Sequence, residues 1–308
     1  MKALITGIDG FVGYHLYKLL IQQGVEVHGT TILEGYINKE IILHKMNLLD
    51  YENVEQVIAK VQPDYVYHLA GQSAVGLSWQ QPAMTMSVNV NGTINLLESV
   101  RKLDKHCRTL IIGSSDQYGP VTPEMCPIQE TTPLNPVSPY GISKCTQEQI
   151  AQLYVKAYAM DIVMVRAFNH IGPMQDINFV IADFASKIVA IEKGAEAVLK
   201  VGNLEAYRDF TDVRDIVNGY TMLMEKGHSG EVYNIGSGKS IKIQTILDIL
   251  LNLATTKIKV EVDSDKLRPL DVPKVECDNS KIKNHTGWTI ANDIHQTLKD
   301  TLNYWRSM

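Results

Sequence analysis

Short apolar runs separated by segments of helical periodicity dominate the first half of the chain. The runs are continuous rather than alternating, which is typical of parallel strands that are covered by helices on both faces. We therefore expect an α/β fold built on a doubly wound, Rossmann-type parallel sheet. The predicted strands are Lys2–Thr6, Val25–Thr30, Ile41–Lys45, Tyr65–Ala70, Thr109–Gly113 and Ile162–Ala167.

Two long helices are predicted in this half, at Leu77–Leu103 and Tyr140–Tyr158. After Arg166 the pattern becomes less regular, with shorter helices and strands, so we expect a smaller α+β lobe formed by the middle and C-terminal parts. The predicted division assigns residues 1–166 plus about 205–235 to a dinucleotide-binding domain, and about 167–204 plus 236–308 to a substrate lobe. The later elements are predicted as helices at Phe179–Lys193, Asp212–Met224 and Ser240–Leu253, and as strands at Val198–Val201, Glu231–Ile235 and Lys257–Val262.

The composition narrows the class of protein. Among 308 residues, 45% are hydrophobic and 20% are charged, which are ordinary globular values. A net charge of −5 without a basic stripe argues against nucleic acid as a partner. The four cysteines form no C-x-x-C pair, so we expect reduced thiols and no metal site. No apolar run approaches the ~20 residues of a membrane span, and we expect a cytoplasmic protein without membrane contact.

A glycine-spaced segment lies where the first strand turns into a predicted helix at Gly10–Ile21. Such a turn brings bare backbone amides and the positive end of a helix against a dinucleotide pyrophosphate. The segment therefore predicts a cofactor site. Its candidate contacts are Gly7, Gly10, Phe11, Val12 and Gly13.

The end of the second strand bears on which dinucleotide binds. An acidic residue there would hydrogen-bond the ribose diol of NAD, but the chain has Thr30 and Thr31, and the first carboxylate after them is that of Glu34. Two hydroxyl groups without a fixed negative charge tolerate a 2′-phosphate. We expect NADP(H), with NAD(H) possible because the arginine that would bind the phosphate is missing.

Tyr140 and Lys144 lie four residues apart at the start of a predicted helix, where Ser138 is a candidate cap. We expect the ammonium of Lys144 to lower the pKa of the Tyr140 phenol and so ease proton transfer. Ser114 follows the fifth strand at its carboxyl end, where ligands bind in such sheets. A hydride carrier beside a proton donor predicts carbonyl and alcohol redox chemistry, with Ser114, Tyr140 and Lys144 as catalytic candidates.

These motifs together resemble the extended short-chain dehydrogenase/reductase family, and within it the enzymes that modify nucleotide sugars. The later segments are most similar to the GDP-mannose branch, and there to reductases of GDP-4-keto-6-deoxy-D-mannose. The resemblance rests on residues 6–13, 68–73, 89–93, 114–119, 140–144, 168–173, 201–204, 208–213 and 268–272.

The resemblance also implies ligand contacts elsewhere in the chain. Arginine forks suit the phosphate oxygens of a nucleotide diphosphate. The further cofactor contacts implied are Asn47, Leu48, Leu69 and Ala70, beside Tyr140 and Lys144. The implied contacts to a GDP-sugar are Gln72, Ser73, Ser115, Asn169, Phe179, Val180, Lys187, Arg208 and Arg268.

The expected reaction is the NADPH-dependent reduction of the C4 keto group of a GDP-6-deoxy-4-keto sugar, of the type that yields GDP-D-rhamnose. A GDP-mannose 4,6-dehydratase or a nucleotide-sugar 4-epimerase, each with an internally recycled cofactor, is the alternative. Dehydratases of the branch usually carry a glutamate where this chain has Asp116, and the shorter side chain disfavours proton abstraction from the sugar. Asp116 is the fourth catalytic candidate, and the sequence leaves open whether it supports dehydration.

Assembly is implied by the same resemblance. The two long predicted helices carry apolar residues beyond one core face, among them Leu153, Val155 and Tyr158. In this family the equivalent helices pair across a two-fold axis. We expect a homodimer held by a four-helix bundle.

Overall fold

Seven parallel strands form the central sheet of the computed structural model, which describes residues 1–264 and 272–308. Their spatial order is β10-β6-β5-β4-β1-β2-β3, and every neighbouring pair is parallel. The expected Rossmann-type α/β fold is confirmed. The strands are β1 Lys2–Thr6, β2 Glu26–Thr31, β3 Ile42–Lys45, β4 Tyr65–His68, β5 Arg108–Ser114, β6 Ile162–Ala167 and β10 Val232–Ile235.

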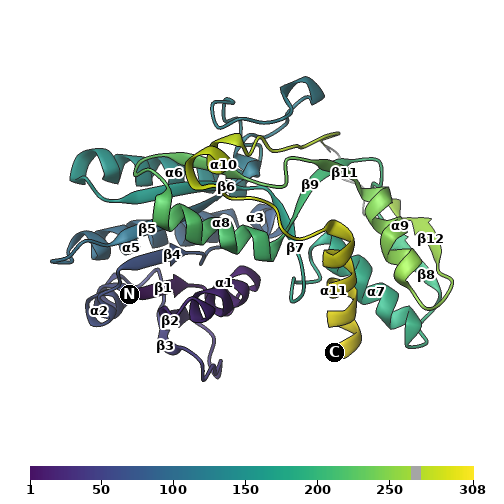
Figure 1. Ribbon diagram of the computed structural model, residues 1–308, viewed down its shortest axis with the longest axis horizontal. Helices are drawn as coiled ribbons and strands as arrows, with labels where there is room; N and C mark the ends of the chain where they lie inside the picture. Colours follow the sequence, from purple (N-terminus) through teal and green to yellow (C-terminus); the bar gives the residue numbers. More distant parts are fainter. Residues whose placement is uncertain (265–271) are drawn as a thin grey trace.

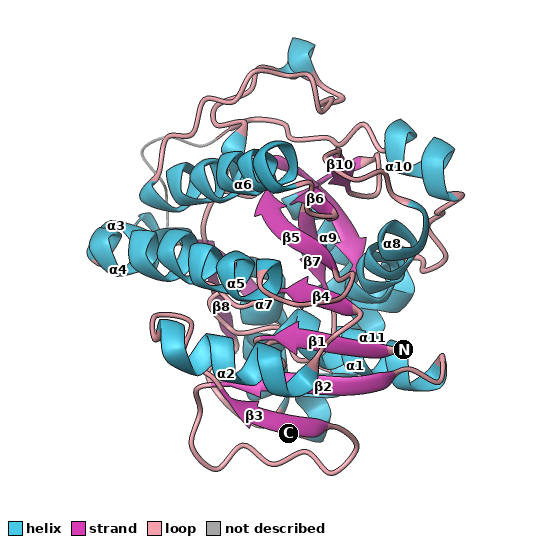
Figure 2. Ribbon diagram, turned by 90° about the vertical axis from the view of Figure 1, so that its left-hand side faces the viewer, coloured by secondary structure: helices cyan, strands magenta, loops and turns pink. Residues whose placement is uncertain are grey.

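Helices cover both faces of this sheet, as Figure 2 shows. α1 (Phe11–Gln22) and α8 (Val213–Lys226) pack on one face, together with Ala3 and Ile5 of β1. The intervening Leu4 points to the other face, where it packs against the helices there. Alternate residues of a strand point to opposite faces, so a strand buried on both must be apolar throughout. The helices of the second face are α2 Tyr51–Val61, α5 Gly92–Arg101 and α6 Pro139–Tyr158.

Two predicted helices differ from the structure. The segment predicted as one helix at Leu77–Leu103 is broken at Gln81, because Pro82 disfavours helical geometry in the residue before it. It divides into α3 Val75–Gln80, α4 Pro82–Met86, the π-helical turn η1 Ser87–Asn91 and α5. The helix predicted at Ser240–Leu253 begins only at Ile243, as α9 Ile243–Leu253. Residues Ser240–Lys242 are instead strand β11, which pairs with β9 (Tyr207–Asp212).

A smaller lobe lies beside the central sheet (Figure 1). Its core is formed by three helices and two small sheets, in the strand orders β11-β9-β7 and β12-β8. The helices are α7 Val180–Glu192, α9 and α11 Ile294–Ser307, and the remaining strands are β7 Asn169–Ile171, β8 Val198–Val201 and β12 Lys259–Val262. α10 (Ser280–Thr286), although late in the chain, packs on α8 and β10 of the larger part.

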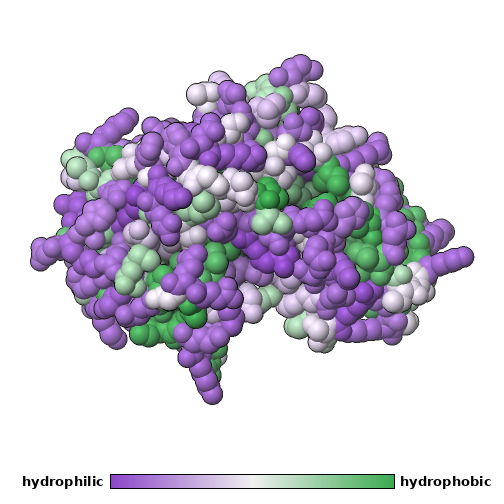
Figure 3. All heavy atoms as spheres, in the orientation of Figure 1, coloured by the Kyte–Doolittle hydropathy of each residue, from purple (hydrophilic) through white to green (hydrophobic). Residues whose placement is uncertain are grey.

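The surface is mainly hydrophilic on the face drawn in Figure 3, with apolar groups confined to separate patches. One patch lies in the region of α1, β2 and β3, where Ile32, Leu33 and Ile37 are exposed. Among the residues described, no helix combines the length and the apolar character that crossing a bilayer requires.

Candidate active site

The glycine turn follows β1 directly and is shaped by close contacts. Gly7 has a φ of +69°, which favours glycine, and its N–H donates to the carbonyl of Thr30 at 3.1 Å. A Cβ on Gly7 would lie 2.9 Å from the Cα of Ala70, and a Cβ on Gly13 would lie 2.5 Å from the carbonyl oxygen of Gly7. The turn therefore has no room for side chains at these two positions.

This tight turn leads into α1, whose N-cap residue Gly10 provides no side-chain hydrogen bond to the helix. The first amides of a helix have no partner within the helix, and they attract an anion such as a phosphate. The predicted contacts Phe11 and Val12 are the first two residues of α1. Backbone amides beside these bare glycines fit a dinucleotide pyrophosphate.

The neighbouring strand ends lie at the same edge of the sheet. Thr30 and Thr31 end β2 and are both buried, and the Thr31 hydroxyl accepts from the N–H of Leu33 at 3.0 Å. The first carboxylate after β2, that of Glu34, is exposed and pairs with Lys45 at 2.8 Å. The end of β2 itself therefore carries hydroxyl groups and no acid, as the sequence predicted.

Two further predicted cofactor segments follow β3 and β4. Asn47 stabilises the turn after β3, where its side chain accepts from the N–H of Leu49 at 3.1 Å. The carbonyl of the next residue, Leu48, accepts from Asn95 at 2.7 Å. After β4, Leu69 is partly buried and the N–H of Ala70 donates to Thr6 at 3.1 Å. The segment after β4 borders the glycine turn, because β4 pairs with β1, whereas the segment after β3 lies two strands away, beyond β2.

Tyr140 and Lys144 lie in the first turns of α6. Ser138 caps the helix by accepting from the N–H of Gly141 at 3.0 Å, and Pro139 occupies the first helical position. Tyr140 and Lys144 are both 7% exposed, and the Lys144 nitrogen lies 6.0 Å from the centre of the Tyr140 ring. The helix start and the shared face are as predicted.

The ionisation of this pair differs from the prediction. Burial lowers the pKa of Lys144 to about 8, and burial together with the nearby Asp116 carboxylate raises the pKa of Tyr140 above its usual value. The nearby Ser114 side chain acts in the opposite direction without cancelling the rise in the pKa of Tyr140. The expectation that Lys144 lowers the pKa of the phenol is wrong for the free protein, because desolvation of the anion outweighs an ammonium that points elsewhere.

The Lys144 ammonium donates to the carbonyl of Ile112 at 2.8 Å and to the side-chain oxygen of Gln147 at 3.0 Å. Gln147 donates in turn to the hydroxyl of Thr93 at 2.8 Å, and Thr93 donates its own proton to the carbonyl of Asn89 at 2.7 Å. Sequence reasoning missed Gln147 and Thr93. The sequence signal for both is polarity at helical positions that are otherwise apolar, and Thr93 also lies in the segment 89–93 that carries the family resemblance.

Two more buried residues extend this network. His68 lies between Thr6 and Thr93, with ring nitrogens 2.9 Å and 3.0 Å from their hydroxyl oxygens. Because the Thr93 proton is already donated, His68 must carry its proton on Nε2 and accept from Thr6 at Nδ1. Burial lowers the pKa of His68 to about 3, so the ring is neutral. The network joins the residue before the glycine turn to the lysine of α6.

Ser114 ends β5 and begins the short 3₁₀ turn η2 (Ser115–Gln117). Its hydroxyl donates to the Asp116 carboxylate at 3.0 Å and accepts from the N–H of the same residue at 3.2 Å. The side chain of Gln117 accepts from the N–H of Ser114 at 2.8 Å. Ser114, Asp116 and Tyr140 therefore lie together at the carboxyl end of β5.

Several predicted substrate residues border this group. The N–H of Gln72 donates to Asn89 at 2.8 Å, and the side-chain oxygen of Gln72 is buried without a hydrogen-bond partner among the described residues. The neighbouring Ser73 is exposed, and Ser115 is half-buried beside Ser114. A buried oxygen without a hydrogen-bond partner costs free energy, so a ligand that donates a hydrogen bond to the Gln72 oxygen would gain affinity.

Among the described residues, the other predicted substrate contacts belong to the smaller lobe. Asn169 is exposed in β7, and Phe179 and Val180, at the start of α7, are 40% and 38% exposed. Lys187 pairs with Asp183 at 2.6 Å, one helical turn earlier. Arg268 lies outside the described residues.

Arg208, in β9, donates to the carbonyls of Tyr207 and Val272 at 2.8 Å and 2.7 Å. The next residue, Asp209, is fully buried, and its carboxylate accepts from the backbone amides of Ser237, Gly238 and Cys277. Asp209 therefore stabilises the fold of the smaller lobe.

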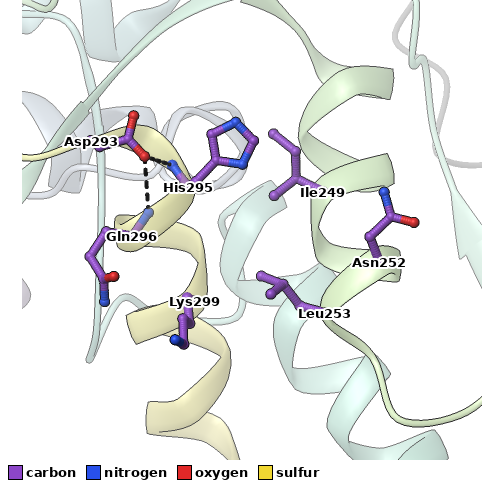
Figure 4. Close-up of a pocket in the computed structure, with 7 residues that line it drawn as sticks. All are labelled: Ile249, Asn252, Leu253, Asp293, His295, Gln296 and Lys299. Carbon is purple, nitrogen blue, oxygen red and sulfur yellow. Dashed lines mark hydrogen bonds between the residues drawn. The ribbon is translucent and has the colours of Figure 1, made fainter.

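A separate groove of about 440 Å³ lies between α9 and α11 (Figure 4). The Asp293 carboxylate caps α11 there, accepting from the backbone amides of His295 and Gln296. The groove contains none of the predicted site residues, and its carboxylate serves a helix end. Its lining is Ile249, Asn252, Leu253, Asp293, His295, Gln296 and Lys299.

Known proteins resemble this chain along its whole length. The model of the GDP-mannose 4,6 dehydratase family matches residues 4–301. The GDP-6-deoxy-D-mannose reductase of Pseudomonas aeruginosa is 32% identical, over 99% of this chain and 97% of the relative. The GDP-mannose 4,6-dehydratase of Yersinia enterocolitica is 31% identical, over 98% and 96%. The solved structure of RMD from Pseudomonas aeruginosa, complexed with NADPH, is 31% identical and superposes with a TM-score of 0.88 over 99% of both chains.

Proposed function

The chain belongs to the GDP-mannose 4,6-dehydratase family of extended short-chain dehydrogenases/reductases, and we propose that within it the protein is a reductase. Its proposed substrate is a GDP-6-deoxy-4-keto sugar, whose C4 keto group is reduced at the expense of NADPH. The product is of the GDP-D-rhamnose type. The similar reductase of Pseudomonas aeruginosa supports this assignment.

The cofactor proposed is NADP(H), with NAD(H) as the alternative. The turn at Gly7 and Gly13, too tight for a Cβ, fits a pyrophosphate, and the similar RMD structure holds NADPH. Thr30 and Thr31 would face the adenosine ribose, and Lys144 the nicotinamide ribose. The other proposed contacts are Gly10, Phe11, Val12, Asn47, Leu48, Leu69, Ala70 and Tyr140. When bound, the reduced nicotinamide supplies a hydride to the substrate carbon.

The protein's own part in the reaction is to hold the carbonyl oxygen and to protonate it. The raised pKa of Tyr140 keeps its phenol protonated at neutral pH, which is the form that can donate to an alkoxide. Ser114 lies beside it and would align the carbonyl oxygen by a hydrogen bond. The charged Lys144, held by Ile112 and Gln147, would bind ribose hydroxyl groups.

One observation carries the choice of reductase over dehydratase. The carboxylate of Asp116, which stands where dehydratases of the branch carry a glutamate, accepts the hydroxyl of Ser114 at 3.0 Å. A short carboxylate held against the serine is poorly suited to remove a proton from the sugar ring. The reduction needs no such base.

A 4,6-dehydratase is the second candidate, because the dehydratase of Yersinia enterocolitica is almost as similar as the reductase. A nucleotide-sugar 4-epimerase is the third. Both would regenerate their cofactor within each turnover, so neither would consume NADPH.

The proposed substrate contacts combine polar groups near Tyr140 with residues of the smaller lobe. Gln72, with its unpaired side-chain oxygen, is a candidate to accept from a sugar hydroxyl. Cationic side chains of the smaller lobe would bind the diphosphate. The full proposed set is Gln72, Ser73, Ser115, Asn169, Phe179, Val180, Lys187, Arg208 and Arg268.

The test is incubation of the purified protein with NADPH and either GDP-4-keto-6-deoxy-D-mannose or GDP-mannose. The proposal expects one NADPH oxidised for each keto sugar consumed and no reaction with GDP-mannose. Conversion of GDP-mannose without loss of NADPH absorbance would identify a dehydratase and overturn the proposal.

We also propose a homodimer formed through α5 and α6, in a four-helix bundle. Leu153 and Tyr158 of α6 are 59% and 52% exposed, which is unusual for large apolar side chains on a helix that also packs on the sheet. Light scattering at micromolar concentration should give twice the mass of the chain. A monomeric mass would contradict the dimer.

A further inference from the structure

The end of β2 has no cation of its own, although NADP(H) carries a phosphate on the ribose that this strand end would face. The six residues of β2 include no lysine or arginine, and the last two are Thr30 and Thr31. The first charged group after them is the exposed carboxylate of Glu34, which repels a phosphate. A phosphate bound here therefore requires a cation from another part of the chain.

The neighbouring strand β3 supplies such a cation. β2 and β3 lie side by side at one edge of the central sheet (Figure 2), and their parallel register places Lys45 beside Thr31. The N–H of the next residue, Met46, donates to the carbonyl of Thr31 at 3.1 Å, so the register continues to the end of both strands. Lys45 also comes two residues before Asn47, a proposed cofactor contact.

Lys45 and Thr31 point to the same face of the sheet. Alternate residues of a strand point to opposite faces. His44 hydrogen-bonds His28 of β2 at 2.9 Å on one face, whereas Leu43 packs on the other face, in the core that includes residues of α1. Lys45 alternates with His44 and therefore lies on the side of α1, the helix whose first amides would receive the cofactor pyrophosphate.

The present partner of Lys45 is easily exchanged. The ammonium donates to the Glu34 carboxylate at 2.8 Å, and the two side chains are 70% and 87% exposed. An ion pair that is so exposed contributes little free energy. A phosphate has more negative charge than one carboxylate and three acceptor oxygens, so a bound 2′-phosphate competes effectively with Glu34 for the ammonium.

Two other lysines lie near the connection between β2 and β3. Lys18, in α1, donates to Glu40 at 2.5 Å and so belongs to a separate ion pair. Lys39 is exposed and lies in the connection itself, six residues before Lys45 and outside either strand. Of the three lysines, Lys45 is therefore the one that the strand register places at the ribose end of β2.

We propose that Lys45 binds the 2′-phosphate of NADP(H), in place of the arginine that the chain lacks at the end of β2. The proposal rests on the NADP(H) cofactor proposed above and does not depend on which reaction follows. Glu34 has the opposite effect, because its carboxylate repels the same phosphate and pairs with Lys45 in the free protein. Lys45 and Glu34 together set the preference between NADP(H) and NAD(H).

The test measures the binding of two small probes by calorimetric titration. Adenosine 2′,5′-bisphosphate carries the 2′-phosphate and 5′-AMP lacks it, so the ratio of their Kd values isolates this one group. Lys45→Met keeps the apolar stem of the side chain and removes its charge. The variant should raise the Kd of the bisphosphate by about tenfold or more, as expected for the loss of a charged hydrogen bond, and leave the Kd of 5′-AMP within about twofold of wild type.

Glu34→Gln separates phosphate binding from a structural role of the ion pair. This variant breaks the same pair but removes the repelling charge, so the Kd of the bisphosphate should fall by about two- to fivefold. If the pair only held the connection in place, both variants would weaken both probes. The matched control is Lys39→Met, the same chemical change in the same connection, which should behave as wild type.

A Lys45→Met variant that keeps the wild-type ratio of the two Kd values would overturn the proposal. Equal losses for both probes in both variants would overturn it as well, and so would a loss of the ratio in Lys39→Met alone. Failure of the NADP(H) assignment has a different signature, because the wild-type protein itself would then bind the two probes equally. The proposal for Lys45 would be contradicted with it.

Discussion

Gly13→Ala tests the glycine turn most sharply, because the added Cβ has nowhere to go. It would lie 2.5 Å from the Gly7 carbonyl oxygen and 2.8 Å from that of Ile8, against the 3.4 Å at which ordinary contact begins. Both obstacles are backbone, so the turn itself must move. The displaced carbonyl of Gly7 belongs to the same turn that would receive the cofactor pyrophosphate.

The magnitude follows from the cost of overpacking, which is about 1–3 kcal/mol. The folded variant relieves this strain by shifting the turn, and NADPH must force the turn back in order to bind. If the whole cost falls on binding, the Kd for NADPH rises by about 5- to 150-fold. Any strain that the shift does not relieve destabilises the folded protein instead. It lowers the melting temperature by about 2–4 °C for each kcal/mol.

Calorimetric titration with NADPH and a thermal melt measure the two parts. Gly76→Ala is the matched control, because its Cβ would meet nothing within 4 Å and the residue lies in helix α3. It should keep the wild-type Kd and gain slightly in stability. A Gly13→Ala variant with wild-type Kd and melting temperature would refute the steric argument.

Three further predictions concern chemistry and stability. Tyr140→Phe should lower kcat by about 10²- to 10⁴-fold and leave the Kd for NADPH unchanged; wild-type turnover would remove Tyr140 as the acid. The pKa of Lys144, lowered by burial to about 8, predicts that NADPH affinity falls as pH rises through 8 and the ammonium loses its charge. Because the pKa of Lys144 is lower in the folded than in the unfolded protein, the charged lysine destabilises the fold below pH 8, and this destabilisation disappears as the pH rises from 8 to the usual lysine pKa. Lys144→Met should abolish the pH dependence of NADPH affinity. Glu148→Ala should cost about 3–5 kcal/mol in urea unfolding, because it leaves Arg166 buried without its bidentate partner, whereas the exposed Glu225→Ala should cost almost nothing.

The sequence was sufficient for most of the central sheet, since strands buried on both faces must be apolar throughout and stand out as runs. It was insufficient where distant residues decide the local structure. Ser240–Lys242 is a strand because β9 offers a partner. The π-helical turn around Asn89 is fixed by the backbone of Gln72 and the hydroxyl of Ser143, far away in sequence.

In the candidate site, too, local features were predictable from the sequence and features that depend on the whole fold were not. Motif spacing predicted that Tyr140 and Lys144 share a helix face, because spacing along a helix is a local property. The ionisation of these residues depends on burial, which the whole fold creates, and the predicted direction for Tyr140 was therefore wrong. The network of His68, Thr93 and Gln147 exists only because β4, α5 and α6 meet.

Tracing the transferred hydrogen tests the central claim most directly. The protein would be incubated with NADPH that carries deuterium at the transferable position of C4, together with GDP-4-keto-6-deoxy-D-mannose, and the product sugar analysed by NMR and mass spectrometry. Reduction at this site predicts one deuterium bound to C4 of the sugar for each NADPH oxidised. A product without deuterium, or with deuterium at any other carbon, would contradict the account.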